Sequence, residues 1–234
     1  MRRIGLLGGM SWESTAVYYR LLNEGTKRRH GGLASADLVL RSVNFAEIER
    51  LQAAGAWDQL GERLGIEAKA LVAAGAELIG IATNTMHLVA PRVEAAGVPV
   101  VHIVDVVADA ALAKRYDTIA LLGTDYLMTA PLYPKRLAAQ GIDVIIPDAD
   151  DRATVHRVIY DELCRGVVSA ESRRRYVDVI ARLAERGAKA VVLGCTEIGL
   201  LIGAADVDVP LLDSTTLHVD ALLLAAEREG TINE

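Results

Sequence analysis

The sequence contains one segment twice, and this repeat limits the folds that the chain can adopt. Residues 75–83 read GAELIGIAT and align without gaps with residues 187–195, GAKAVVLGC. Shorter matches flank this pair on both sides: residues 4–8 with 119–123, and residues 98–100 with 209–211. The offsets of 115, 112 and 111 residues indicate one duplicated unit with small insertions or deletions. We therefore expect two similar halves, with Thr83 and Cys195 at equivalent strand ends that face one cleft.

Composition and charge exclude several classes of protein. Apolar residues make up 52% of the 234 residues and aromatic residues only 4%, so aliphatic side chains must fill the core, as in parallel sheets covered by helices. The net charge of −6 comes with no basic stripe, which argues against a nucleic-acid partner. No apolar run approaches 18 residues, so we expect no membrane span. The two cysteines form no disulfide framework, which favours a reducing cytoplasm.

Short Val-, Ile- and Leu-rich runs alternate with longer helical patterns, which predicts an α/β fold with parallel sheets. We expect strands near residues 3–8, 37–43, 77–82, 99–103, 117–123, 142–146, 189–194 and 209–212. We expect helices near residues 12–29, 57–74, 104–114, 125–139, 151–164, 170–186 and 214–229. Gly75, Gly97 and Gly187 follow predicted helices, where a left-handed residue is favoured. Pro91 must kink or restart the helix that follows His87.

The repeat also predicts the division of the chain. Residues 1–98 together with 211–234 form the expected first subdomain, and residues 99–210 form the second. Ligands of open α/β sheets bind beyond the carboxyl ends of the strands. The segments to search are therefore residues 8–11, with Met10, 41–44, with Ser42, 83–87, 124–126 and 195–197.

The loop at residues 5–11, GLLGGMS, follows the first strand but matches neither a dinucleotide fingerprint nor a P-loop. Its glycines would let backbone N–H groups approach an anion at a helix start. The structural alternative is a tight turn capped by Ser11.

Polar residues follow both repeated strands. Residues 83–87 read TNTMH and begin with three consecutive polar residues. A helix cap would account for one of them, so contact with a substrate explains the three together better. His87 would lie one turn into the following helix, where an isolated histidine is more often structural than catalytic. Cys195 is either a small buried hydrophobe or a thiol whose pKa a helix N-terminus lowers. The five histidines show no metal-ligand spacing, and the chain has no G-x-S-x-G elbow, so we expect neither a metal site nor a serine hydrolase.

Three motifs in order resemble the aspartate/glutamate racemase family: IGLLGGMSWEST at residues 4–15, TNTMH at 83–87 and GCTEI at 194–198. The similarity runs from residue 4 to about residue 213. It implies two three-layer αβα subdomains with pseudo-mirror symmetry, an active site between them, a homodimer and no cofactor. It also implies an acidic amino acid as substrate, with its carboxylate held by Asn84, Thr85 and Thr196. Glu197 stands in the same retained pattern, and Thr124 matches another pocket threonine of the family.

The departures from the family pattern affect the chemistry. Thr83 stands where the family has its first cysteine, which serves the D-enantiomer, whereas Cys195 keeps the second, which takes the α-proton of the L-enantiomer. Glu197 replaces the histidine that glutamate racemases of cell-wall synthesis usually carry, which disfavours that role. Cys164, beside Arg165, replaces a basic residue of some members, so the anchor of the side-chain carboxylate is open.

These residues predict a cofactor-independent racemase of L-aspartate or L-glutamate that is biased to the L-enantiomer, with Cys195 and Thr83 as the catalytic pair. A thiolate is a reasonable base if its ordinary pKa of about 8.5 is lowered, whereas a threonine hydroxyl is far too weak an acid to ionise unaided. The rival functions are a single-cysteine decarboxylase or cis–trans isomerase of the same superfamily, and a non-catalytic amino-acid-binding protein.

Overall fold

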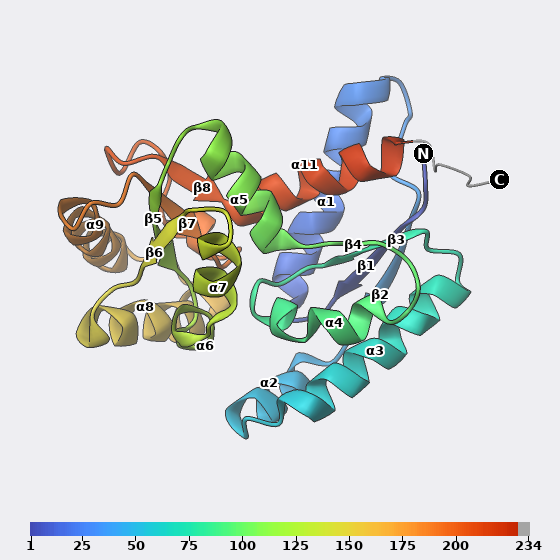
Figure 1. Ribbon diagram of the computed structural model, residues 1–234, viewed down its shortest axis with the longest axis horizontal. Coiled ribbons are helices and arrows are strands. Elements are labelled where there is room, and N and C mark those ends of the chain that lie inside the picture. The colour runs from blue at the N-terminus through green and yellow to red at the C-terminus, as the bar shows by residue number, and fades with distance from the viewer. Residues whose placement is uncertain (229–234) are drawn as a thin grey trace. The chain divides into compact units, whose positions relative to one another are not determined.

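The computed structural model describes residues 1–228, which form two compact units (Figure 1). The first contains Met1–His102 and the chain from His218 onward, and the second is Ile103–Leu217. The sequence suggested boundaries at residues 98/99 and 210/211, and the expected tail to residue 234 and helix end at residue 229 lie outside the described residues. No helix within residues 1–228 is long and apolar enough to cross a membrane.

The first unit is built on a parallel sheet with the order β2-β1-β3-β4. Its strands are β1 Ile4–Gly8, β2 Leu38–Ser42, β3 Leu78–Ile81 and β4 Val100–Val101. Its helices are α1 Trp12–His30, α2 Phe45–Ala53, α3 Trp57–Ala73, the 3-10 helix η1 Thr85–Val89 and α4 Ala90–Glu94. To these is added most of α11, which spans Ser214–Glu227 and enters this unit at His218.

Helices cover both faces of the first sheet because alternate strand residues point to opposite sides. Ile4 and Leu6 of β1 pack in one cluster with residues of α1 and α11. Leu7 of β1 and Ile79 of β3 pack in another with residues of α2, α3 and α4. Figure 1 shows α1 and α11 on one side of this sheet and α3 and α4 on the other. Each buried Leu or Ile side chain contributes about 1.5–3 kcal/mol to this three-layer arrangement.

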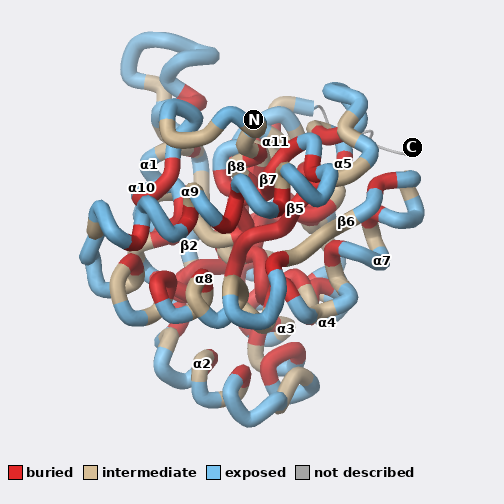
Figure 2. The backbone as a smooth tube through the Cα atoms, turned by 90° about the vertical axis from the view of Figure 1, so that its left-hand side faces the viewer, coloured by how far each residue is buried: buried red, intermediate tan, exposed pale blue. Residues whose placement is uncertain are grey.

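The second unit repeats the same strand order, β6-β5-β7-β8, again with all strands parallel. Its strands are β5 Thr118–Leu122, β6 Asp143–Ile145, β7 Ala190–Leu193 and β8 Leu211–Asp213. Its helices are α5 Ile103–Ala113, α6 Asp125–Thr129, α7 Leu132–Ala138, α8 Ala149–Asp161, the 3-10 helix η2 Leu163–Arg165, α9 Ala170–Glu185 and α10 Ile198–Leu201. Figure 2 shows β5 and β7, the buried centre of this sheet, mostly in red.

The predicted α/β class with two parallel sheets is confirmed, and each predicted strand overlaps an observed one. The predicted helix at residues 125–139 is divided, because Pro131 lacks an N–H and becomes the cap residue of α7. Helix α2, capped by the Asn44 side chain, was not predicted. Pro91 stands at the start of α4, as expected, and Gly75 has the expected positive φ of 92°.

The packing of α11 on the first sheet predicts a difference between two neighbouring leucines. Leu222 is fully buried and lies against Gly80 of β3, whereas Leu224 is 48% exposed. We expect Leu222→Ala to lower the free energy of unfolding by about 2–5 kcal/mol through the lost contacts and the cavity. The control Leu224→Ala should change it by less than about 0.5 kcal/mol. Urea unfolding followed by circular dichroism measures both, and equal losses would contradict the packing of α11 on this sheet.

Candidate active site

Three segments of the first unit meet at one edge of its sheet. Gly8 at the end of β1 pairs with Ser42 of β2. On the other side of β1, Leu7 pairs with Ile81, the last residue of β3. Because all three strands are parallel, the segments that follow them start side by side: residues 9–11, 43–44 and 82–87. These are segments that the sequence selected.

The glycine loop after β1 is held by hydrogen bonds of its own. The N–H of Gly9 donates to Thr15 Oγ1 at 2.7 Å, and Ser11 Oγ accepts from the N–H of Ser14 at 3.1 Å as the cap of α1. Gly9 has a φ of 86°, and a Cβ on it would lie 2.3 Å from the carbonyl oxygen of Val43. A tight turn capped by Ser11 therefore accounts for Gly9, and its N–H is already used within the protein.

Thr83 differs from the residues that follow it in its exposure. Thr83 is half-buried, whereas Asn84, Thr85 and His87 are buried. The carbonyl oxygen of Thr83 accepts a hydrogen bond from His87 Nδ1 at 2.9 Å. The backbone of Thr83 is thus fixed from one turn further along, and its side chain is the most exposed polar group in this run.

Two further predicted residues of the first unit lie in different environments. Met10 is buried in the cluster shared with α2 and α3, so its side chain fills the core. Ser42 is exposed at the end of β2. The cation next to it, Arg41, is engaged, because its Nη2 donates at 3.0 Å to the buried carboxylate of Glu67 and its Nη1 donates to the Ser42 carbonyl.

In the second unit, a carboxylate faces the thiol at the end of β7. Cys195 Sγ donates a hydrogen bond to Glu197 Oε2 at 3.0 Å. Glu197 is buried, with 5% of its surface exposed, and Cys195 is half-buried. The structure therefore brings together two of the predicted site residues as one hydrogen-bonded acid pair.

The thiol pKa departs from the sequence expectation. Burial raises the pKa of Cys195 well above its ordinary value, and the negative charge and hydrogen bond of Glu197 and the neighbouring thiol of Cys164 raise it further. The backbone N–H of Glu197 lowers the thiol pKa, but this effect is smaller than those that raise it. Of the two alternatives for Cys195, a buried thiol or a thiol with a lowered pKa, the raised pKa favours the first.

The two predicted threonines of the second unit have defined partners. Thr124 Oγ1 accepts from the N–H of Leu127 at 3.3 Å and so caps α6. Thr196 Oγ1 lies 3.2 Å from Thr215 Oγ1. Both threonines are half-buried, so their hydroxyl groups are only partly withdrawn from the surface.

Two strand ends that the sequence rule also selects were overlooked. The end of β8 leads into residues 213–216, DSTT, which include Thr215, the partner of Thr196. The end of β4 leads into His102, which packs edge to face against His87 with ring centroids 4.7 Å apart. His87 is therefore not a lone histidine. Within residues 1–228, no group of three His, Cys, Asp or Glu side chains is arranged to hold a metal ion.

Comparison with known proteins agrees with this architecture. Residues 7–222 match the family model described as Asp/Glu/hydantoin racemase. Because the match covers most of the chain, the protein belongs to the Asp/Glu/hydantoin racemase family.

Solved structures give the same relationship. A Yersinia pestis protein provisionally assigned as an Asp/Glu racemase is 47% identical, with a TM-score of 0.91 over 97% of this chain and 100% of that one. An aspartate racemase homologue from Pyrococcus horikoshii is 35% identical, with a TM-score of 0.85 over the same shares of the two chains. The aspartate racemase of Picrophilus torridus, at 21% identity and a TM-score of 0.74 over 98% of this chain and 96% of that one, shares the fold.

The pair of Cys195 and Glu197 predicts how the thiol titrates. Glu197→Gln removes the negative charge that raises the thiol pKa, so the pKa of Cys195 should fall and the thiol should react at lower pH. The rate of alkylation by iodoacetamide, followed against pH in a Cys164→Ala background, reports this thiol alone, because the chain has only two cysteines. Glu162→Gln is the matched control, since Glu162 bonds to Ser172 instead. If the pH midpoint of alkylation is the same with and without Glu197→Gln, the carboxylate does not control the pKa of the thiol.

Proposed function

We propose that the protein is a cofactor-independent amino-acid racemase that acts on L-aspartate or L-glutamate. The observation that carries the proposal is the hydrogen-bonded pair of Cys195 and Glu197 at the end of β7. In the repeat, Thr83 holds the position equivalent to Cys195, at the end of β3. Family membership and the relatives described as aspartate racemases or their homologues support the same reaction class.

In the proposed reaction Cys195 is the base for the L-enantiomer. Its thiol first gives its proton to Glu197, the acceptor at 3.0 Å, or to solvent. The thiolate then takes the α-proton, the C–H bond breaks, and its electron pair stays on the α-carbon. The ammonium group of a bound amino acid favours the thiolate, because a nearby positive charge lowers a thiol pKa. The substrate thus supplies part of the activation that the free protein lacks.

Thr83 returns a proton to the opposite face of the α-carbon. A carbanion is a much stronger base than an alkoxide, so a neutral hydroxyl can donate although it cannot ionise unaided. The new C–H bond gives the D-enantiomer. Solvent then restores the proton on Thr83 Oγ1 and takes the proton that Glu197 had accepted. Asn84, Thr85 and Thr196 would hold the substrate carboxylate, whose fixed hydrogen bonds also stabilise the charge that develops on the carbanion.

The first test is α-hydrogen exchange in D₂O, without added cofactor or metal. We expect proton NMR to show loss of the α-signal of L-aspartate or L-glutamate with the wild-type protein. Cys195→Ala should retain less than about one-hundredth of that rate, the usual effect of removing a general base. Cys164→Ala, which removes the other half-buried thiol, should stay within about tenfold.

Two results would contradict this proposal. Exchange in Cys195→Ala at the wild-type rate would assign the base to another residue. If folded wild-type protein exchanges the α-hydrogen of no acidic or neutral L-amino acid, the protein is a non-catalytic amino-acid-binding protein. Release of CO₂ would instead show that it is a decarboxylase.

The second test is the asymmetry between enantiomers. Cys195 can become a thiolate and Thr83 cannot, so we expect α-exchange from L-substrate to be at least about tenfold faster than from D-substrate, because proton transfer follows the pKa of the base. The equilibrium remains at equal concentrations, because the enantiomers have equal free energy. Thr83→Cys should raise the rate from the D-enantiomer, with Thr83→Ser as the control that keeps a hydroxyl. Equal initial rates for both enantiomers in the wild type would rule out the pairing of Thr83 with Cys195.

A further inference from the structure

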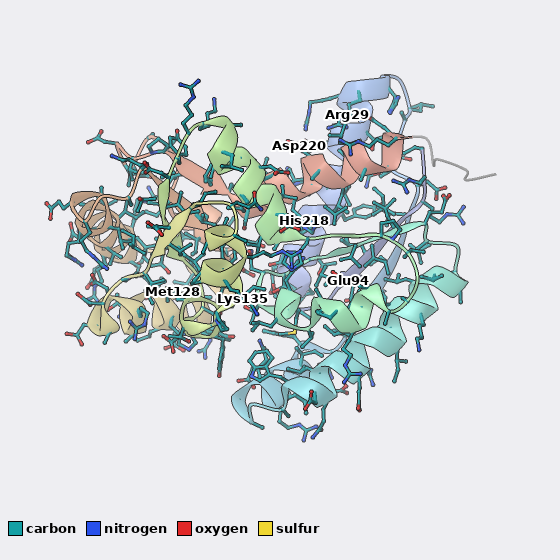
Figure 3. The ribbon with its side chains drawn as sticks, viewed as in Figure 1. Arg29, Glu94, Met128, Lys135, His218 and Asp220 are labelled. Carbon is teal, nitrogen blue, oxygen red and sulfur yellow. The ribbon has the colours of Figure 1, made fainter. Side chains whose placement is uncertain are left out.

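Three histidines from distant parts of the sequence form a buried cluster in the first unit. His87 lies in η1 and His102 follows β4. His218, which is labelled in Figure 3, lies on α11. The ring of His87 packs edge to face on both others, with centroids 4.7 Å from His102 and 5.6 Å from His218. All three side chains are at most 5% exposed. The reaction proposed above uses none of them directly.

The hydrogen bonds of His218 fix its protonation. Its Nε2 lies 2.8 Å from the carbonyl oxygen of Val101, which only accepts, so Nε2 carries the hydrogen. Its Nδ1 then accepts from the hydroxyl of Tyr18 at 2.9 Å. Burial lowers the pKa of His218 to about 4, so the ring is neutral at neutral pH. His218 is thus a fixed, uncharged surface for its neighbours.

The same reasoning assigns the tautomer of His87. Its Nδ1 lies 2.9 Å from the carbonyl oxygen of Thr83, which again only accepts. Its Nε2 is buried and makes no hydrogen bond of standard geometry within residues 1–228, so the bond to Thr83 is the better defined of its contacts with the backbone. Burial and the nearby rings of His218 and His102 lower the pKa of His87 well below its ordinary value, although the backbone carbonyl groups of Thr83 and Val101 raise it. His87 is therefore neutral, and its hydrogen lies on Nδ1 and points to Thr83.

The packing partners of His87 lie where the chain changes units. His102 is the last residue before the segment that forms the second unit, and His218 is the first residue after it. The ring that bonds to Thr83 is therefore fixed against both points at which the chain leaves and re-enters the first unit. This arrangement restrains the backbone of Thr83, which lies outside regular structure between β3 and η1.

We propose that His87 is the positioning residue for Thr83. Its Nδ1–H holds the Thr83 carbonyl so that the hydroxyl is aligned to return a proton to the carbanion, and His102 and His218 hold the ring in place. This inference rests on the proposed racemase function. Alignment matters for Thr83 because its hydroxyl must lie within reach of the α-carbon, in the right orientation, for the proton to be transferred.

The test separates two fates of one carbanion. After Cys195 removes the α-proton of an L-substrate in D₂O, its thiol exchanges that proton for a solvent deuteron. Return of this deuteron to the same face of the α-carbon gives labelled L-product. Delivery by Thr83 gives labelled D-product. The ratio of D-product formation to exchange with retention therefore measures delivery by Thr83. Loss of folded protein or weaker substrate binding lowers both rates together and leaves this ratio unchanged.

Asparagine and glutamine make a matched pair of variants at His87. The asparagine amide nitrogen occupies the place of Nδ1, whereas the glutamine amide nitrogen occupies the place of Nε2. We expect His87→Gln to lower the ratio of D-product to retained exchange by about tenfold or more, as misplacement of a reacting group does. His87→Asn should keep the ratio within about threefold of the wild type, since it restores the donor to Thr83. A role in packing alone predicts the opposite order, because glutamine fills the space of histidine better.

An unchanged ratio in His87→Gln, or an equal loss in His87→Asn, would overturn the assignment. If wild-type protein shows no exchange, the proposed function fails, and the His87 contact is tested separately by NMR of the ¹⁵N-histidine-labelled wild-type protein. His87, assigned through its nuclear Overhauser contacts with Thr83, should carry its hydrogen on Nδ1. A hydrogen on Nε2 would overturn the inference without any measurement of activity.

Discussion

Parallel pairing of each central strand with its two neighbours determines where the chemistry of this protein can lie. In the first sheet β1 pairs with β2 and β3, and in the second β5 pairs with β6 and β7. Parallel strands end at the same edge, so the polar segments that follow them are neighbours within each unit. The helices on both faces then bury the sheets, and the carboxyl ends of the strands are left as the place where polar side chains collect.

The two copies of the repeat have diverged around their end residues. The offset of 112 residues that aligns Thr83 with Cys195 also aligns Thr85 with Glu197 and His87 with Gly199. The first copy thus has an imidazole that holds the backbone of its end residue, and the second has a carboxylate that holds the side chain of its own. In the proposed reaction the hydroxyl of Thr83 must be aligned with the α-carbon, whereas the thiol of Cys195 must lose its proton before it can act as a base. The duplicated fold was retained while the support of each group changed.

The sequence predicts the strands well because the hydrophobic pattern of a buried parallel strand is local. The prediction of helices is less accurate. Pro131 divides a helix that was predicted as continuous, and the short helix α2 was not predicted. Motif position also located Cys195 and Glu197, but not the direction of the thiol pKa, which depends on burial and on where the Glu197 carboxylate points. The histidine cluster is invisible in sequence spacing, since His102 and His218 meet His87 only after the sheet and α11 have formed.

The thiol of Cys195 and the imidazoles near Thr83 are all uncharged in the free protein. The thiol of Cys195 is kept protonated by burial and by Glu197, and the imidazoles of His87 and His218 are kept neutral by burial. A neutral imidazole can hold a carbonyl without placing a cation beside Thr83. A protonated thiol is a poor nucleophile and is protected from oxidation, because the thiolate is the reactive form. In the proposed reaction the ammonium group of the substrate brings a positive charge close to the thiol, which favours the thiolate when a substrate is bound.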